Sequence, residues 1–245
     1  MRYIIAFFGF LIFFDILLCN IYSRYSQRKK NTKSQTVKSV VAPQKKVEQH
    51  TNKKGLKALL RCIVKKVEPY LYGLCRYSVI LVGKIPSHRV RKFILRKVFL
   101  MKIHPKAIIY GGFEIRSPWN IKLGRCIVGV GALLDGRNGI EIEDDVCLAQ
   151  NVYIYTEQHD LNDPWFRCND KGGMVKIKKR AWISSRTTIL PKVEVGEGSV
   201  LASGAIATKS LESYGVYAGI PAKKISERNR NLEYELCRSD YWHFY

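Results

Sequence analysis

Branched aliphatic side chains recur at every sixth residue through the second half of the chain. Six residues at about 3.6 per turn would rotate such positions off any single helix face, so the period excludes an amphipathic helix. A short strand followed by a turn fits it, with the aliphatic residue pointing inward and three hexads closing one triangular coil. Fifteen such positions predict about five coils: Ile103, Ile109, Ile115, Ile121, Ile127, Leu133, Ile142, Leu148, Ile154, Ile177, Ile183, Ile189, Val195, Leu201 and Ala207.

One outer face of this predicted prism is apolar. Its outward positions, one residue before each inward one, should stack from coil to coil. We expect such a stripe to be covered by another subunit or by the helical segment that precedes the repeats. The same alignment makes two thiols neighbours on adjacent coils. The stripe is predicted to contain Ile108, Cys126, Cys147, Trp182 and Val200.

Residues 1–23 are predicted to form a membrane anchor. Only Asp15 and Asn20 are strongly polar between Tyr3 and Tyr22, and a helix of about 20 residues crosses a hydrocarbon core of roughly 30 Å. A cleaved signal peptide is the alternative, but the apolar stretch is long for one and no small-x-small site follows it. Basic residues follow the stretch closely, which favours a cytoplasmic position for the rest of the chain.

The segment between the anchor and the repeats is strongly basic. Residues 1–102 hold 23 Lys and Arg against 3 Asp and Glu, whereas the remaining residues hold 19 against 17. Residues 24–55 are a polar linker, and residues 56–102 have the pattern of a basic amphipathic helical segment. We expect residues 24–102 to contact an anionic membrane surface or to dock on the following domain. Nucleic-acid binding is not favoured, because no motif for it accompanies the charge.

Seven cysteines are present, an odd number without a CxxC pair. In a chain of 245 residues this usage favours reduced thiols in a cytoplasmic setting over a disulfide framework.

The repeat region resembles a known family. The motifs that carry the resemblance are LDGRNGIEI, which ends at Ile142, YTEQHDLNDPWF (155–166), WISSRTTILPKVEVGEGSVLASGAIATKS (182–210) and YAGIPAKKI (217–225). Residues 103–225 are similar to the left-handed parallel β-helix of the hexapeptide-repeat acyltransferases, and most similar to the maltose, galactoside and colanic-acid O-acetyltransferase branch. The resemblance implies a mainly β fold and a homotrimer, with acetyl-CoA as co-substrate in the groove between neighbouring prisms and no metal.

His159 is the candidate catalytic base. It lies on the long excursion between Ile154 and Ile177, and the insertions of a solenoid gather on its binding face. A neutral imidazole can accept the proton of an attacking hydroxyl, and His159 matches the position of the family's general base. A solvated loop histidine is the structural alternative.

Three further residues match the family's acceptor and oxyanion positions. Ser185 matches the residue that offers the oxyanion donor, although Ser184 replaces a customary Gly and Arg186 follows it. Asp135 matches a carboxylate that helps to hold the acceptor sugar in relatives, and a turn-forming Asp is equally compatible with its place. Trp165, next to Phe166, is a candidate platform for a sugar ring or an anchor for the loop.

Candidate residues for the donor lie in the last coils. Ser203 and Gly204, with Ser185, are small enough to leave room for a pantetheine arm, although small residues also suit any tight coil corner. Hydroxyl and ammonium groups nearby could bind the phosphates: Thr208, Lys209, Lys223 and Lys224.

Taken together, the sequence predicts an acetyl-CoA-dependent O-acetyltransferase at the bacterial inner membrane, with its catalytic domain on the cytoplasmic side. The expected acceptor is a saccharide, including a lipid-linked precursor of a surface polysaccharide. Two alternatives stay open: an N-acetyltransferase of an amino-sugar nucleotide, and a non-catalytic trimeric scaffold at the membrane. Residues 226–245 form an aromatic C-terminal tail that should pack on an unidentified surface.

Overall fold

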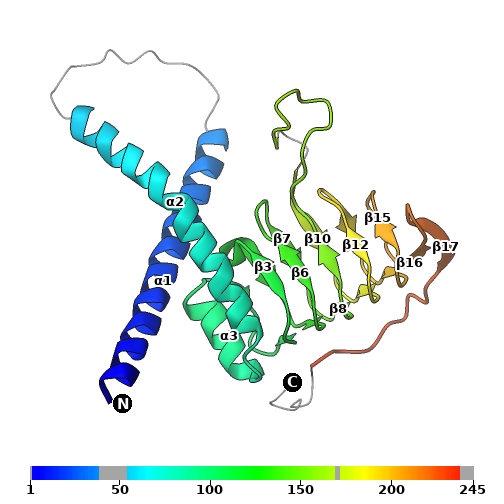
Figure 1. Cartoon of the computed structure of the whole chain (residues 1–245). Coiled ribbons are helices and arrows are strands. Elements are labelled where there is room, and N and C mark those ends of the chain that lie inside the picture. The colour runs from blue at the N-terminus through cyan, green and yellow to red at the C-terminus, as the bar shows by residue number, and fades with distance from the viewer. Residues whose placement is uncertain (1, 39–53, 169–171, 238–245) are drawn as a thin grey trace. The chain divides into compact units, whose positions relative to one another are not determined.

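The computed structural model describes residues 2–38, 54–168 and 172–237, with side chains for residues 10–32, 62–168 and 172–237. The chain divides into two compact units, Met1–Ser78 and Val79–Tyr245. The first unit is helical, and the second consists of a short helix and a stack of β-coils (Figure 1).

Two long helices form the first unit. Helix α1 spans Arg2–Lys38 and helix α2 spans Lys54–Gly83, its last turn belonging to the second unit. Ser78 donates to Asp15, and Lys29 pairs with Glu68. Going along α1 from Asp15 to Lys29, the contacted residue on α2 moves back from Ser78 to Glu68. The two helices therefore run antiparallel.

The predicted anchor over residues 1–23 is not supported. Among residues whose side chains are described, no helix combines the length and the apolar character that crossing a membrane requires. Residues 1–9, which make up part of the predicted anchor, lie outside that set.

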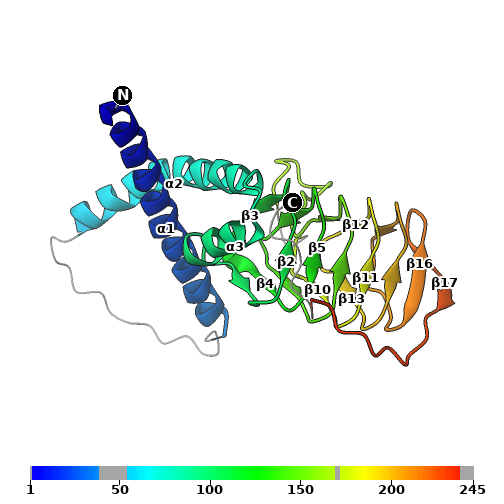
Figure 2. The same cartoon turned by 90° about the horizontal axis from the view of Figure 1, so that it is seen from below.

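Short parallel strands build three sheets in the second unit, which are the three sides of a parallel β-solenoid (Figures 1 and 2). The first sheet consists of β1 (Lys102–Ile103), β4 (Ile121–Leu123), β7 (Ile140–Ile142), β10 (Val175–Ile177) and β13 (Glu194–Val195). The second sheet consists of β2 (Ile108–Ile109), β5 (Ile127–Val128), β8 (Cys147–Leu148), β11 (Trp182–Ile183), β14 (Val200–Leu201), β16 (Gly215–Ala218) and the antiparallel β17 (Lys223–Glu227). The third sheet consists of β3 (Glu114–Arg116), β6 (Leu133–Asp135), β9 (Tyr153–Ile154), β12 (Thr188–Ile189) and β15 (Ile206–Ala207).

The inward residues of neighbouring coils stack into buried aliphatic columns. In the second sheet, for example, Leu148 pairs with Ile183, and Ile183 pairs with Leu201. All three are inaccessible to solvent. Removing such side chains from water is the main source of stability in this region. The predicted three-sided parallel architecture is therefore confirmed.

The prediction was wrong about the register of the second coil. Ile127 pairs with Ile108 and Cys147 on the outside, and its neighbour Val128 points inward. Leu134 likewise replaces Leu133 as the inward residue. The short 3-10 helix η1 (Pro118–Asn120) lengthens the preceding corner and breaks the six-residue spacing.

This shift also corrects the predicted outer stripe. Cys126 is fully buried at a corner, so Ile127, and not Cys126, lies between Ile108 and Cys147 on the outer face. Cys147, Trp182 and Val200 follow in register, as predicted.

The solenoid has about six turns where five were expected. The additional turn is partial. Leu211 bridges to Val195 of the first sheet, and β16 pairs with β14 of the second sheet.

Helix α3 (His88–Lys97) packs on the first coil of the solenoid (Figure 2). Its Arg91 is buried, and the guanidinium donates to the carbonyls of Ile85 and Ile109. Lys92 donates to the carbonyls of Pro105 and Ala107. This part of the predicted basic segment therefore covers the aliphatic column at its open end.

The C-terminal tail runs back along the corner between the first and second sheets. Arg228 and Tyr234 both donate to the carbonyl of Arg180. Further along, the amide of Leu236 donates to Asp145, and the thiol of Cys237 donates to the carbonyl of Cys126. The tail thus contacts three successive coils. The aromatic residues 241–245 of the tail lie outside the described residues.

Candidate active site

A protruding loop joins β9 to β10 and carries His159 (Figure 1). Gly173 donates to the carbonyl of Thr156 at the base of this loop. Nearer the tip, Asp160 donates through its amide to the carbonyl of Arg167. Asp163 accepts from the amide of Trp165 at 2.7 Å and from the guanidinium of Arg167 at 2.8 Å. These bonds fold the loop back on itself and bring residues 166–168 beside His159.

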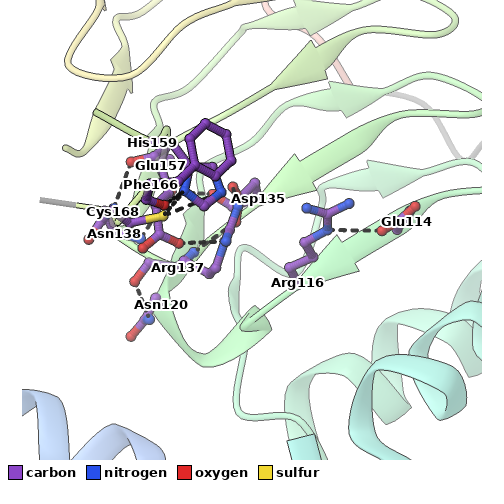
Figure 3. Close-up of polar contacts among 11 residues, drawn as sticks. Glu114, Arg116, Asn120, Asp135, Arg137, Asn138, Glu157, His159, Phe166 and Cys168 are labelled. Carbon is purple, nitrogen blue, oxygen red and sulfur yellow. Dashed lines mark hydrogen bonds and ion pairs between the residues drawn. The ribbon is translucent and has the colours of Figure 1, made fainter. Parts of the chain in front are cut away.

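The imidazole of His159 is held by Phe166. Nδ1 lies 2.5 Å from the carbonyl oxygen of Phe166, and the two rings stack with centroids 4.0 Å apart and planes 7° from parallel (Figure 3). A carbonyl oxygen can only accept, so Nδ1 carries the proton in this contact. In the neutral tautomer with this hydrogen bond, the lone pair is on Nε2. His159 is exposed, so its ring is accessible from solvent.

A thiol also contacts this ring. Cys168 Sγ lies 3.5 Å from Nδ1 and 3.8 Å from Nε2 of His159, and Cys168 is exposed. This contact was not predicted, because Cys168 is nine residues from His159 and no local pattern links the two.

Asp135 is fully buried and pairs with Arg137 through both carboxylate oxygens, at 2.9 and 2.8 Å. Arg137 also pairs with Glu157 at 2.6 Å (Figure 3). Asp135 was a candidate from the sequence, whereas its pairing with Arg137 and the contact with Glu157 were not predicted, although the Asp-Gly-Arg spacing of the turn was the available signal. The carboxylate of Asp135 is thus committed to the turn.

Thr156 connects this turn to the loop that carries His159. Its hydroxyl donates to the carbonyl of Asp135 at 2.6 Å and accepts from the amide of Asn138 at 3.0 Å. The side-chain amide of Asn138 donates to the carbonyl of Thr156 at 2.7 Å. The base of the loop that carries His159 is therefore fixed to the coil below it.

The predicted sugar platform stands apart from this network. Trp165 is 76% exposed, and its backbone amide donates to Asp163. Its indole is available for a ligand or for another subunit.

Ser185, Ser203 and Gly204 share the corner between the second and third sheets. The amide of Gly204 donates to the carbonyl of Ser185 at 3.0 Å, and the hydroxyls of Ser184 and Ser203 lie 2.7 Å apart. Gly204 has a φ of +73°, and a Cβ added there would meet no atom within 4 Å. Arg186 takes the same left-handed backbone position one coil below, with a φ of +59°. Ser184, Ser185, Ser203 and Gly204 thus form an open surface of small residues, which we call the Ser185 ledge.

The other donor candidates are exposed. Thr208 and Lys209 follow β15 at the corner between the third and first sheets, and Lys223 and Lys224 lie on β17. Lys224 Nζ lies 2.9 Å from Glu212 and 3.0 Å from Glu227. Hydrogen bonds to these two carboxylates raise the pKa of Lys224 above its usual value.

The candidate residues therefore gather at two different corners of one chain. His159 and Asp135 belong to the corner that follows the third sheet, whereas Ser185 and Ser203 belong to the corner that precedes it. Within one chain the third sheet lies between His159 and the corner that holds Ser185. In the part of the chain that the structure describes, no group of three or more His, Cys, Asp and Glu residues could hold a metal ion.

No protein-family model matches the chain. Among curated proteins, a putative acetyltransferase of Staphylococcus aureus (strain Mu50 / ATCC 700699) is 30% identical over 132 residues, which are 52% of this chain and 65% of that protein. The putative colanic acid biosynthesis acetyltransferase of Escherichia coli (strain K12) is 30% identical over 142 residues, 58% of this chain and 76% of that protein. The chain thus matches slightly less than two thirds of the length of the staphylococcal relative.

Among solved structures, a hexapeptide-repeat-containing acetyltransferase from Vibrio cholerae O1 biovar eltor, complexed with acetyl coenzyme A, has a TM-score of 0.56. It is 17% identical in sequence, and the match covers 74% of this chain and 94% of that chain. This likeness supports the solenoid fold.

Proposed function

Because this chain belongs to the hexapeptide-repeat acetyltransferase family, we propose that it transfers an acetyl group from acetyl-CoA to a hydroxyl group of a saccharide. The relatives named above as acetyltransferases support the donor. The name of the Escherichia coli relative, which refers to colanic acid biosynthesis, supports a saccharide acceptor.

The observation that carries the mechanism is the contact between His159 and Phe166. The Phe166 carbonyl accepts from Nδ1 at 2.5 Å, which leaves the Nε2 lone pair as the base. In the proposed reaction Nε2 takes the proton of the acceptor hydroxyl while its oxygen attacks the thioester carbonyl. The tetrahedral intermediate then expels CoA as a thiolate, which receives that proton from His159.

Ser185 is the proposed oxyanion donor. The negative charge that develops on the thioester oxygen requires a hydrogen-bond donor placed in advance. Ser185 lies on the small-residue ledge beside Gly204, where the open space above the glycine would admit a pantetheine arm.

We further propose that the active unit is a homotrimer. The separation of His159 from the Ser185 ledge within one chain favours a site completed by a neighbouring copy. The outer positions of the first sheet are charged at Lys122, Glu141 and Lys176, whereas Trp182 and Tyr153 are exposed on the other two sheets. The apolar faces suit subunit contacts, and the charged face suits solvent.

The test is a screen of the purified full chain with acetyl-CoA and candidate glycans, with CoA release as the readout. We expect His159→Ala to lower turnover by about 10² to 10⁴ while binding of CoA is retained. His104→Ala is the matched control, because His104 is also exposed on the solenoid but lies on the first coil. Full activity of His159→Ala would remove the base assignment.

The products distinguish the alternatives. An acetyl ester is cleaved by alkaline hydroxylamine, whereas an acetamide resists it, so a resistant product would assign N-acetylation instead. Absence of both CoA release and thermal stabilisation by CoA would support the non-catalytic scaffold.

A further inference from the structure

The contact face between α1 and α2 contains small and hydrogen-bonding side chains beside the buried Tyr22. Ser78 donates to Asp15 at 3.0 Å, and the thiol of Cys75 donates to the carbonyl of Cys19 at 3.9 Å. Ser23 is fully buried and donates to the carbonyl of Cys19 at 2.7 Å. Close helix packing through small and hydrogen-bonding residues is typical of helices that pack in lipid.

The opposite faces of α1 are apolar and exposed. Phe10, Ile12 and Phe13 are 62%, 61% and 64% exposed. A helix pair in water buries its apolar side, whereas α1 leaves a run of large apolar side chains exposed. The exposed apolar side chains of α1 are Phe10, Leu11, Ile12, Phe13, Phe14, Ile16, Leu17 and Ile21.

Positive charge gathers at one end of the same pair. On α1 the apolar stretch is followed by the exposed Arg24 and Arg28, and then by Lys29. Because the helices are antiparallel and Lys29 contacts Glu68, the exposed Lys65 and Lys66 of α2 belong to this end as well. Such a basic end is complementary to anionic headgroups.

We propose that this helix pair, α1 residues 10–32 with α2 residues 62–78, docks in an anionic lipid bilayer. The apolar side chains of residues 10–21 lie among acyl chains, and the basic end contacts the headgroups. Lipid is the occupant that satisfies both observations, because it meets the apolar faces and the positive end together. The inference goes beyond acetyl transfer and does not depend on it.

The test is flotation of the full chain with vesicles of phosphatidylcholine, alone or mixed with phosphatidylglycerol. We expect the protein to float with the mixed vesicles. Ile12→Glu combined with Phe13→Glu should abolish flotation, and these positions make no packing contact that folding requires because they are exposed. Ile225→Glu is the matched control, since Ile225 is 64% exposed on β17, and it should float like the parent.

A second variant tests the charge. Arg24→Glu with Arg28→Glu should weaken binding to the mixed vesicles by about tenfold or more, since each basic residue near an anionic surface contributes about 1 kcal/mol. Flotation that is unchanged in the Ile12/Phe13 variant would overturn the proposal. So would a parent chain that ignores both kinds of vesicle and instead associates through α1 with a second copy, seen as concentration-dependent growth in mass. Acetylation of glycans in solution is measured separately. A failure of the proposed acetyl transfer can therefore be distinguished from a failure of lipid binding.

Discussion

Phe166 holds His159 in two ways, through its carbonyl oxygen and through its ring, which stacks at 4.0 Å. Phe166→Ala removes the stacking but keeps the backbone acceptor. We expect kcat to fall about tenfold to a hundredfold, because a base that is free to turn is less often aligned, while the KM for acetyl-CoA stays unchanged. Steady-state kinetics check this. Leu161→Ala, at a 91% exposed position of the same loop, should leave kcat intact, and equal losses in both variants would contradict the positioning role.

Alkylation of Cys168 should abolish the proposed acetyl transfer. Its sulfur lies 3.5 Å from His159 Nδ1, so a maleimide adduct would occupy the space next to the base. We expect N-ethylmaleimide to abolish acetyl transfer by the parent chain but not by Cys168→Ser. Cys62→Ser removes the other exposed thiol and is the control. This variant should be as sensitive to N-ethylmaleimide as the parent chain. Inactivation of Cys168→Ser at the parent rate would refute the prediction.

Asp135→Ala should destabilise the solenoid. Asp135 is fully buried and pairs bidentately with Arg137, and loss of a buried partner costs about 2 to 4 kcal/mol. Urea denaturation measures the free energy of unfolding. Glu141→Ala removes the surface pair with Lys122 and should change that free energy by less than about 1 kcal/mol. The prediction fails if the two variants are equally stable.

Trp182→Arg should disrupt the proposed trimer. Trp182 is 45% exposed at the centre of the outer face of the second sheet, and a charge there would be buried by a neighbouring subunit. Light scattering after gel filtration should give a monomer mass for this variant. Lys176→Glu on the charged first sheet should keep the mass of the parent. A trimer that persists in Trp182→Arg would place the interface elsewhere.

Release of the C-terminal tail should increase at alkaline pH. Burial raises the pKa of Cys237 from 9.0 to about 11. The detached thiol therefore ionises from about pH 9 upward while the docked thiol still holds its proton, so docking is favoured fully below pH 9 and weakens between pH 9 and about 11. The rate at which Cys237 reacts with a disulfide reagent, corrected for thiolate fraction, should rise in this window. Arg228→Ala should release the tail already at neutral pH. An unchanged rate in both cases would show that the tail does not detach.

The solenoid was predictable because its period is carried by many residues, and one misplaced residue does not hide it. The second coil was misread because aliphatic residues stand side by side there. Either Ile127 or Val128 satisfies the pattern, and only the corner at Pro118–Asn120 decides which one turns inward.

For the candidate site, the sequence predicted the position of His159 on a long loop but not the contacts that the loop makes. His159 stands on the long insertion and was identified, whereas its partners depend on how that loop folds back. Neither the carbonyl of Phe166 nor the thiol of Cys168 has a sequence signal, because Asp163 and its turn bring them to the imidazole. On α1 the apolar residues were visible in the sequence, but the buried position of Ser23 and Asp15's bond to Ser78 were not.

In a solenoid whose coils contact only their neighbours, the terminal coil can unfold while the other coils stay folded. The C-terminal tail changes this for the second to fourth coils, because it is bonded to Arg180, Asp145 and Cys126 in turn. Unfolding of the last coil therefore also has to detach the tail. We expect the coils that the tail connects to unfold together, as one cooperative unit.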